Sequence, residues 1–133
     1  MLYWRGCATQ HTKHVTYKLA YHFVWCPKYR KRILTGKIAA FVEQEIHGLC
    51  ETNGWTLGAL NIQEDHVHVF LSAPAAVAPS QIAHILKGAT ARSVFQRFVF
   101  REEVGMGGAF WSRSYSVGSV GDMSVQTVLK YIE

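Results

Sequence analysis

The residues best placed to do chemistry are two histidines, His66 and His68, which are separated by a single valine. They lie in an alternating stretch, Asp65-His66-Val67-His68-Val69-Phe70-Leu71, whose β-branched residues predict a strand. Successive strand side chains point to opposite faces, so both imidazoles are predicted on one face and the valines on the other. Paired neutral imidazoles can share a divalent metal ion, although such a pair is also common on the solvated face of a strand.

The surrounding segments predict one domain, residues 1–133, that holds this strand in an antiparallel sheet. The expected strands are 17–25, 55–62, 66–71 and 110–117, and the expected helices are 36–53, 81–100 with Ser80 as N-cap, and 122–133 after glycine-bearing breaks at 105–108 and 118–121. The first six elements follow the split β-α-β order of an α+β, ferredoxin-like fold. In that fold the first strand and the histidine strand lie side by side at the sheet centre, which can bring His22 near the metal-binding face.

Composition narrows the possible classes of protein. With 133 residues, 49% of them hydrophobic, and no apolar run of about 18 residues, the chain is expected to bury a core without crossing a membrane. The N-terminal residues 1–14 lack the apolar segment of a signal peptide, so a cytoplasmic location is expected. Three widely spaced cysteines fit neither a disulfide framework nor a paired zinc motif.

A net charge of +5 points to a polyanionic partner, and one segment concentrates it. After Pro27 come four cations and one aromatic: Lys28, Tyr29, Arg30, Lys31 and Arg32. Clustered cations neutralise phosphates and an interleaved tyrosine can stack on an unpaired base, although a solvated basic loop is an equally simple interpretation. Lys87 and Arg92, on the second predicted helix, are further candidate DNA contacts.

Three stretches together resemble the TnpA-type HUH transposases, the single-tyrosine enzymes that move small bacterial insertion sequences as single-stranded DNA. The first is Tyr21-His22-Phe23-Val24-Trp25-Cys26-Pro27-Lys28-Tyr29-Arg30, the second is Asp65-His66-Val67-His68, and the third runs from Ser116-Val117-Gly118-Ser119 through Val128-Leu129-Lys130-Tyr131-Ile132-Glu133. The resemblance implies that His66 and His68 bind Mg²⁺ or Mn²⁺. It also implies that Tyr131, on the C-terminal helix, is the nucleophile that forms a 5′-phosphotyrosine.

The same resemblance implies further partners. Family members recognise DNA hairpins at the element ends and form homodimers whose last helix can complete the partner's active site. A further metal ligand is expected one helical turn after Tyr131, beyond Glu133, so a missing C-terminal tail is expected.

Two other interpretations remain open at this point. A non-catalytic module of the same fold that binds single-stranded nucleic acid explains the charge and the aromatics, but not the combination of two histidines with Tyr131. A histidine-dependent phosphohydrolase is disfavoured because the third position of a His-x-His-x-His motif is Phe70.

Overall fold

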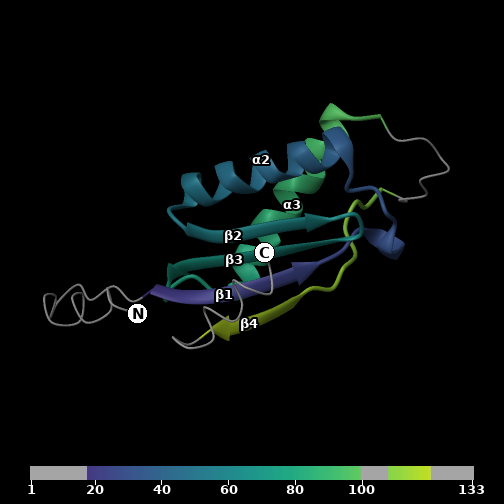
Figure 1. Cartoon of the computed structure of the whole chain (residues 1–133). Helices are drawn as coiled ribbons and strands as arrows, with labels where there is room; N and C mark the ends of the chain where they lie inside the picture. Colours follow the sequence, from purple (N-terminus) through teal and green to yellow (C-terminus); the bar gives the residue numbers. More distant parts are fainter. Residues whose placement is uncertain (1–17, 100–107, 121–133) are drawn as a thin grey trace, which may run out of the picture.

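A four-stranded antiparallel sheet forms the centre of the molecule, which the computed structural model describes over residues 18–99 and 108–120. The strands are β1 (Lys18–Trp25), β2 (Thr56–Gln63), β3 (His66–Pro74) and β4 (Ser116–Val120), in the spatial order β2-β3-β1-β4 (Figure 1). This order confirms the predicted ferredoxin-like arrangement, with the first strand and the histidine strand paired at the sheet centre.

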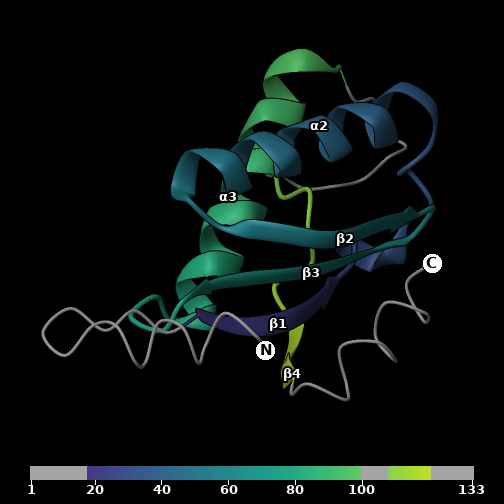
Figure 2. The same cartoon turned by 60° about the vertical axis from the view of Figure 1, so that its left-hand side comes forward.

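Two helices, α2 (Gly36–Asn53) and α3 (Pro79–Arg97), cover one face of the sheet, and a short 3₁₀ helix, η1 (Lys28–Arg30), follows β1 (Figure 2). The core fills the space between the helices and that face; its fully buried members include Phe23, Trp25, Val42, Ile46, Val67, Val69, Leu71, Ile82 and Leu86. No described helix covers the opposite face, on which the histidines lie. In the described part of the chain, neither helix combines the length and apolar character that a membrane span needs.

Helix α2 begins and ends where the sequence predicts. Its apolar residues recur with helical spacing, and Val42, Ile46 and Cys50 are buried against the rest of the core. Gly54 ends the helix in a left-handed conformation (φ 75°), from which its N–H reaches the carbonyls of Cys50 and Glu51. The glycine is suited to this position because it adopts positive φ at little cost.

Helix α3 begins earlier than predicted, at Pro79 instead of Gln81. Proline fits the first helical position because an N–H there has no intrahelical partner. The side chain of Gln81 accepts a hydrogen bond from the backbone N–H of Ala78 (3.0 Å), so the predicted N-cap role of Ser80 is wrong. The helix also ends early, at Arg97, because the next residue is extended.

The fourth strand begins at Ser116, and the prediction that it starts at residue 110 is wrong. Phe110 and Trp111 are adjacent and both buried, so they do not alternate between two faces as strand residues do. Trp111 instead donates a hydrogen bond from Nε1 to Oγ1 of Thr90 on α3 (2.8 Å). The sequence also predicts a flexible break at 118–121. This prediction is wrong for residues 118–120, because they pair with β1, and residue 121 lies outside the described residues.

Candidate functional site

The histidine strand β3 has the two faces that its sequence predicts. Val67, Val69 and Leu71 have no exposed surface and point into the core. His66 and His68 are half-buried on the other face, with their ring centroids 4.8 Å apart and their planes at 81°. The alternation of the strand therefore places two imidazoles together on the face that the helices leave open.

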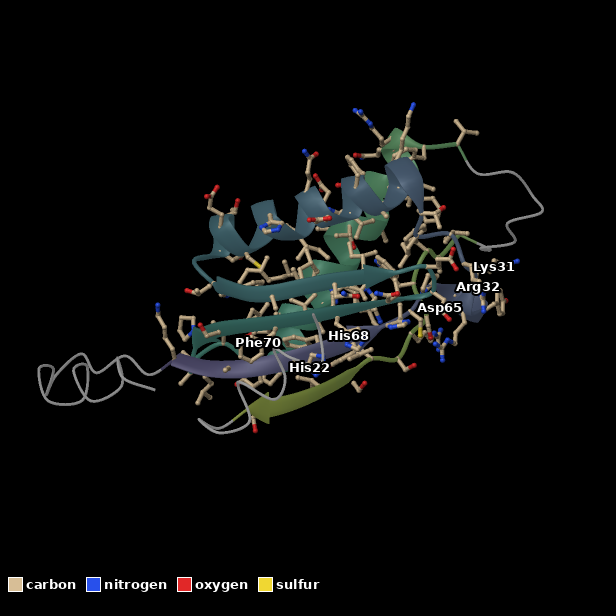
Figure 3. All side chains as sticks on the ribbon, in the orientation of Figure 1. His22, Lys31, Arg32, Asp65, His68 and Phe70 are labelled. Atoms are coloured by element: carbon tan, nitrogen blue, oxygen red, sulfur yellow. The ribbon has the colours of Figure 1, made fainter. Side chains whose placement is uncertain are left out.

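A third histidine, His22 of β1, lies against this pair as predicted. Its Nε2 is 3.0 Å from Nδ1 of His68, and the two ring planes differ by 11° (Figure 3). In the β1–β3 register, His22 is opposite Phe70 and His68 is opposite Val24, so the two histidines are diagonal neighbours. The Cα atoms of diagonal neighbours lie about 7–8 Å apart across the two strands, which is within the reach of long side chains.

Two of the three histidines, His68 and His22, have environments that favour the neutral imidazole. Burial, followed by the nearby charges of His66 and His22, lowers the pKa of His68 to about 4. Burial also lowers the pKa of His22 below its usual value. A neutral imidazole has one ring nitrogen without a proton, which is the state a metal ligand needs.

Asp65 is a site residue that the sequence argument did not single out. Its Oδ1 lies 2.7 Å from Nδ1 of His66, and its Oδ2 accepts a hydrogen bond from Nη2 of Arg30 at 3.1 Å. The hydrogen bond to His66 is the main cause that lowers the pKa of Asp65, and the positive charge of Arg30 adds to it. Its position directly before His66 in the sequence was the available signal, because an adjacent carboxylate commonly orients a metal-binding imidazole.

Among the described residues, the side chains of His66 and His68 have the chemistry and the orientation that a metal ligand needs. The Nδ1 atoms of both His66 and His68 are engaged by neighbours, Asp65 and His22 respectively. A proton on each Nδ1 places the unprotonated nitrogen of each ring at Nε2, which is the usual tautomer of metal-binding histidines. Over residues 18–99 and 108–120, no group of three or more His, Cys, Asp or Glu side chains is arranged to hold an ion, so metal binding by His66 and His68 stays a prediction.

The basic segment lies at the end of the sheet next to Asp65, and we call residues 28–32 the basic loop (Figure 3). Tyr29 is 70% exposed, and Nζ of Lys28 lies 5.4 Å from its ring centroid. Both Tyr29 (φ 62°) and Arg30 (φ 50°) have left-handed backbones, which cost a non-glycine residue roughly 1–2 kcal/mol each. Strain of this kind often accumulates where a loop must present side chains to a ligand.

The two remaining cations of the basic loop are Lys31 and Arg32. Arg32 lies 3.8 Å from Glu64 as a highly exposed ion pair, and Lys31 is half-buried. Exposed pairs of this kind contribute at most about 1 kcal/mol, so phosphate can compete with them. DNA contacts by the loop stay a prediction.

Lys87 and Arg92, the two DNA contacts predicted on helix α3, have different surroundings. Arg92 is exposed on α3. Lys87 instead donates from Nζ to the carbonyls of Ser112 (2.7 Å), Arg113 (3.1 Å) and Ser114 (3.2 Å). Its ammonium is thereby engaged in holding the segment before β4 against α3. These contacts support a structural role for Lys87 and leave it half-buried, so it is less exposed than expected, while its contact with DNA stays a prediction.

Tyr131, the predicted nucleophile, lies outside the described residues, as does the predicted helix 122–133. The described site therefore contains the predicted metal ligands, the adjacent basic loop, and the two contacts that engage the Nδ1 atoms.

Comparison with known proteins places these features in one family. Residues 15–133 match the family model described as "Transposase IS200 like". The chain is 34% identical over 117 residues to the ISDra2 transposase TnpA of Deinococcus radiodurans, covering 88% of this chain and 84% of the relative. It is 28% identical over 108 residues to the transposase for insertion sequence element IS200 of Salmonella typhimurium, covering 81% and 71%.

Solved structures that resemble this chain include two described as transposases. One is the crystal structure of a proposed transposase from Deinococcus radiodurans R1, with a TM-score of 0.75, 32% identity and coverage of 92% of this chain and 94% of the other. The second is a REP-associated tyrosine transposase bound to a REP hairpin, with a TM-score of 0.66, 11% identity and coverage of 92% and 70%. At that identity the second likeness supports the fold alone.

Proposed function

The chain belongs to the IS200-like transposase family, and we propose that it cleaves and rejoins single-stranded DNA through a covalent bond to Tyr131. The observation that carries this proposal is the paired histidine face. His66 and His68 lie side by side, each with its Nδ1 engaged by a neighbouring side chain. A non-catalytic binding module has no need for two imidazoles oriented in this way.

His66 and His68 would hold a divalent ion, Mg²⁺ or Mn²⁺. Such an ion would supply positive charge to a phosphate oxygen and would help to orient the phosphodiester for in-line attack. Imidazole is a softer ligand than carboxylate or water, which favours Mn²⁺ of the two. Asp65 and His22 keep the two rings in place beside the scissile phosphate.

Tyr131 then supplies the nucleophile. Its phenolic oxygen loses its proton and bonds to the phosphorus, the bond from phosphorus to the 3′-oxygen breaks, and the 3′-oxygen takes up a proton and leaves as a hydroxyl. The 5′-phosphotyrosine is itself a phosphodiester of similar free energy, so a second 3′-hydroxyl can attack it, release the tyrosine with a proton and join new ends. Cleavage and rejoining thus need no external energy source.

The basic loop and Arg92 are the proposed DNA contacts. Arg30, Lys31 and Arg32 lie at the same end of the sheet as His66, so a strand held by them passes close to the histidine face. The hairpin held by the REP-associated relative is consistent with a hairpin partner for this chain. A homodimer in which the last helix completes the partner's site is part of the proposal.

A covalent trapping experiment tests the function. The chain is incubated with Mn²⁺ and labelled hairpin-forming single-stranded oligonucleotides taken from the DNA that flanks its own coding sequence. We expect a protein–DNA adduct that survives denaturation and is lost in Tyr131→Phe and in His66→Ala. Tyr115→Phe, which alters a partly exposed tyrosine before β4, is the matched control and retains the adduct.

Two other outcomes contradict the proposal. Hairpin binding without an adduct indicates the non-catalytic module, since binding then needs no nucleophile. Release of free nucleotides without an adduct indicates a hydrolase.

A further inference from the structure

We propose that His22, whose Nε2 lies 3.0 Å from Nδ1 of His68, is a positioning residue for the metal site that accepts a hydrogen bond from His68 and thereby favours the tautomer in which Nε2 of His68 carries no proton. This inference rests on the proposed function only in that His68 is taken as a metal ligand. His22 itself touches neither the ion nor the DNA in this role.

The geometry of the two rings favours a directed hydrogen bond over a stack. The planes of His22 and His68 differ by only 11°, yet the ring centroids are 5.2 Å apart while the two nitrogens are 3.0 Å apart. The centroids are thus farther apart than the nitrogens by about the width of a ring. Two nearly parallel rings show this relation when they lie edge to edge and their nitrogens face each other, which is the arrangement of a well-aligned N–H···N bond.

The fold holds this contact in place from both sides. His22 and His68 lie on β1 and β3, the two central strands, which pair along the whole of β1. The residues that flank each histidine, Tyr21, Phe23, Val67 and Val69, are buried in the core, so neither backbone position can rotate its side chain to the other face. On its other side His22 is opposite Gly118 of β4, where no side chain competes for the ring.

Only one of the two possible proton positions is compatible with a ligand. Two neutral imidazoles that face each other share a single proton between them. If His22 donates, the proton of His68 is on Nε2, and that nitrogen cannot bind a metal. If His68 donates from Nδ1, its Nε2 carries the lone pair. An acceptor at the position of His22 therefore prepares the ligand before the ion arrives, as Asp65 does for His66.

Mn²⁺ titration of the full chain tests this role by a readout that is independent of catalysis. His22→Leu removes the acceptor and fills a similar volume, and we expect it to weaken Mn²⁺ binding by about 10- to 100-fold. His22→Gln, whose amide oxygen can accept the same hydrogen bond, should restore most of the affinity. His47→Leu, which removes an exposed histidine of α2, is the matched control and should bind as the unaltered chain does.

The tautomer can also be measured directly in the unaltered chain without metal, so the proposal stays testable if His22→Leu does not fold. Imidazole nitrogen shifts in a ¹⁵N NMR spectrum should show that His68 is protonated at Nδ1 and unprotonated at Nε2. A proton on Nε2 of His68 overturns the proposal, and so does a His22→Leu variant that is folded and binds Mn²⁺ normally.

Failure of the proposed function has a different signature. If the unaltered chain binds no Mn²⁺, or if His66→Ala leaves its Mn²⁺ binding unchanged, the metal site itself is absent. If binding depends on His66 and His68 but not on His22, only the positioning role fails.

Discussion

Arg30 and Asp65 form an ion pair, Nη2 to Oδ2 at 3.1 Å, that joins the basic loop to the start of the histidine strand. The other oxygen of Asp65 is bonded to His66. One carboxylate therefore contacts both a predicted DNA-binding cation and a predicted metal ligand. A phosphate that approaches Arg30 also approaches the carboxylate that orients His66.

Asp65→Asn is expected to weaken Mn²⁺ binding by about 10-fold or more, because a neutral amide holds the Nδ1 proton of His66 less strongly than a carboxylate does. Isothermal titration with Mn²⁺ measures the change. Glu64→Gln is a matched control at the preceding position, since the Glu64 side chain forms an ion pair with the exposed Arg32, at 3.8 Å, and its backbone hydrogen bond with Leu34 is retained in the variant. Equal affinities of the two variants would show that Asp65 has no role in orienting the ligand.

Tyr29→Asn is expected to separate stability from DNA binding. Asparagine tolerates the left-handed backbone at this position, so the free energy of unfolding should stay equal or rise by up to about 1 kcal/mol. Loss of an exposed aromatic that stacks on a base should cost about 1–3 kcal/mol of binding to single-stranded DNA. Urea unfolding and fluorescence anisotropy measure the two quantities.

Tyr29→Phe keeps the ring and serves as the control for that experiment. It should bind single-stranded DNA nearly as the unaltered chain does. A Tyr29→Asn variant that binds equally well would contradict a stacking role.

Lys87→Met is expected to lower the free energy of unfolding by about 1–3 kcal/mol, because the carbonyls of residues 112–114 lose a charged donor that binds all three. Methionine retains part of the apolar stem beside Tyr115. Chemical unfolding gives the stability. Lys37→Met, at an exposed position of α2, is the control and should change stability little.

Substitutions of Lys87 and Arg92 test the predicted contacts between helix α3 and DNA. Each phosphate contact that is lost reduces the slope of log affinity against log salt by about 0.7 for single-stranded DNA. We expect Arg92→Met to reduce this slope and Lys87→Met to leave it unchanged. A reduced slope for folded Lys87→Met would return Lys87 to the DNA-binding surface.

Cys50 should make stability fall at alkaline pH. Burial raises the pKa of its thiol from the usual 9.0 to about 11 in the folded chain. The unfolded chain therefore releases this proton first, and the contribution of the thiol is present in full below pH 9.0 and is lost as the pH rises toward 11. Urea unfolding across this range should show a smaller decline for Cys50→Ala than for the unaltered chain. Equal declines would contradict the assignment.

The elements that the sequence predicts well are those in which one pattern determines the outcome. Strict alternation around His66 and His68 decides which residues face the core, and the helical spacing that ends at Gly54 decides the extent of α2. Their order along the chain then limits the sheet to few topologies, which is why the neighbourhood of His22 could be expected.

The errors arise where tertiary contacts override the local pattern. Phe110 and Trp111 have strand propensity, but burying both against the core and Thr90 is more favourable than pairing them in a strand. Lys87 looks like a solvated cation in sequence, and only the approach of residues 112–114 gives it three acceptors. Neither contact has a signal in the local sequence.

The histidine site and the hydrophobic core share strand β3, so a change in the length of this strand affects both. Deleting Val67 would exchange the faces of every later side chain in β3, so His68 would face the core and Val69 would face solvent. Point substitutions can alter the core and the site separately, whereas a change of length by one residue damages both at once. Variation in this family is therefore expected to preserve the length of β3 even where its individual residues change.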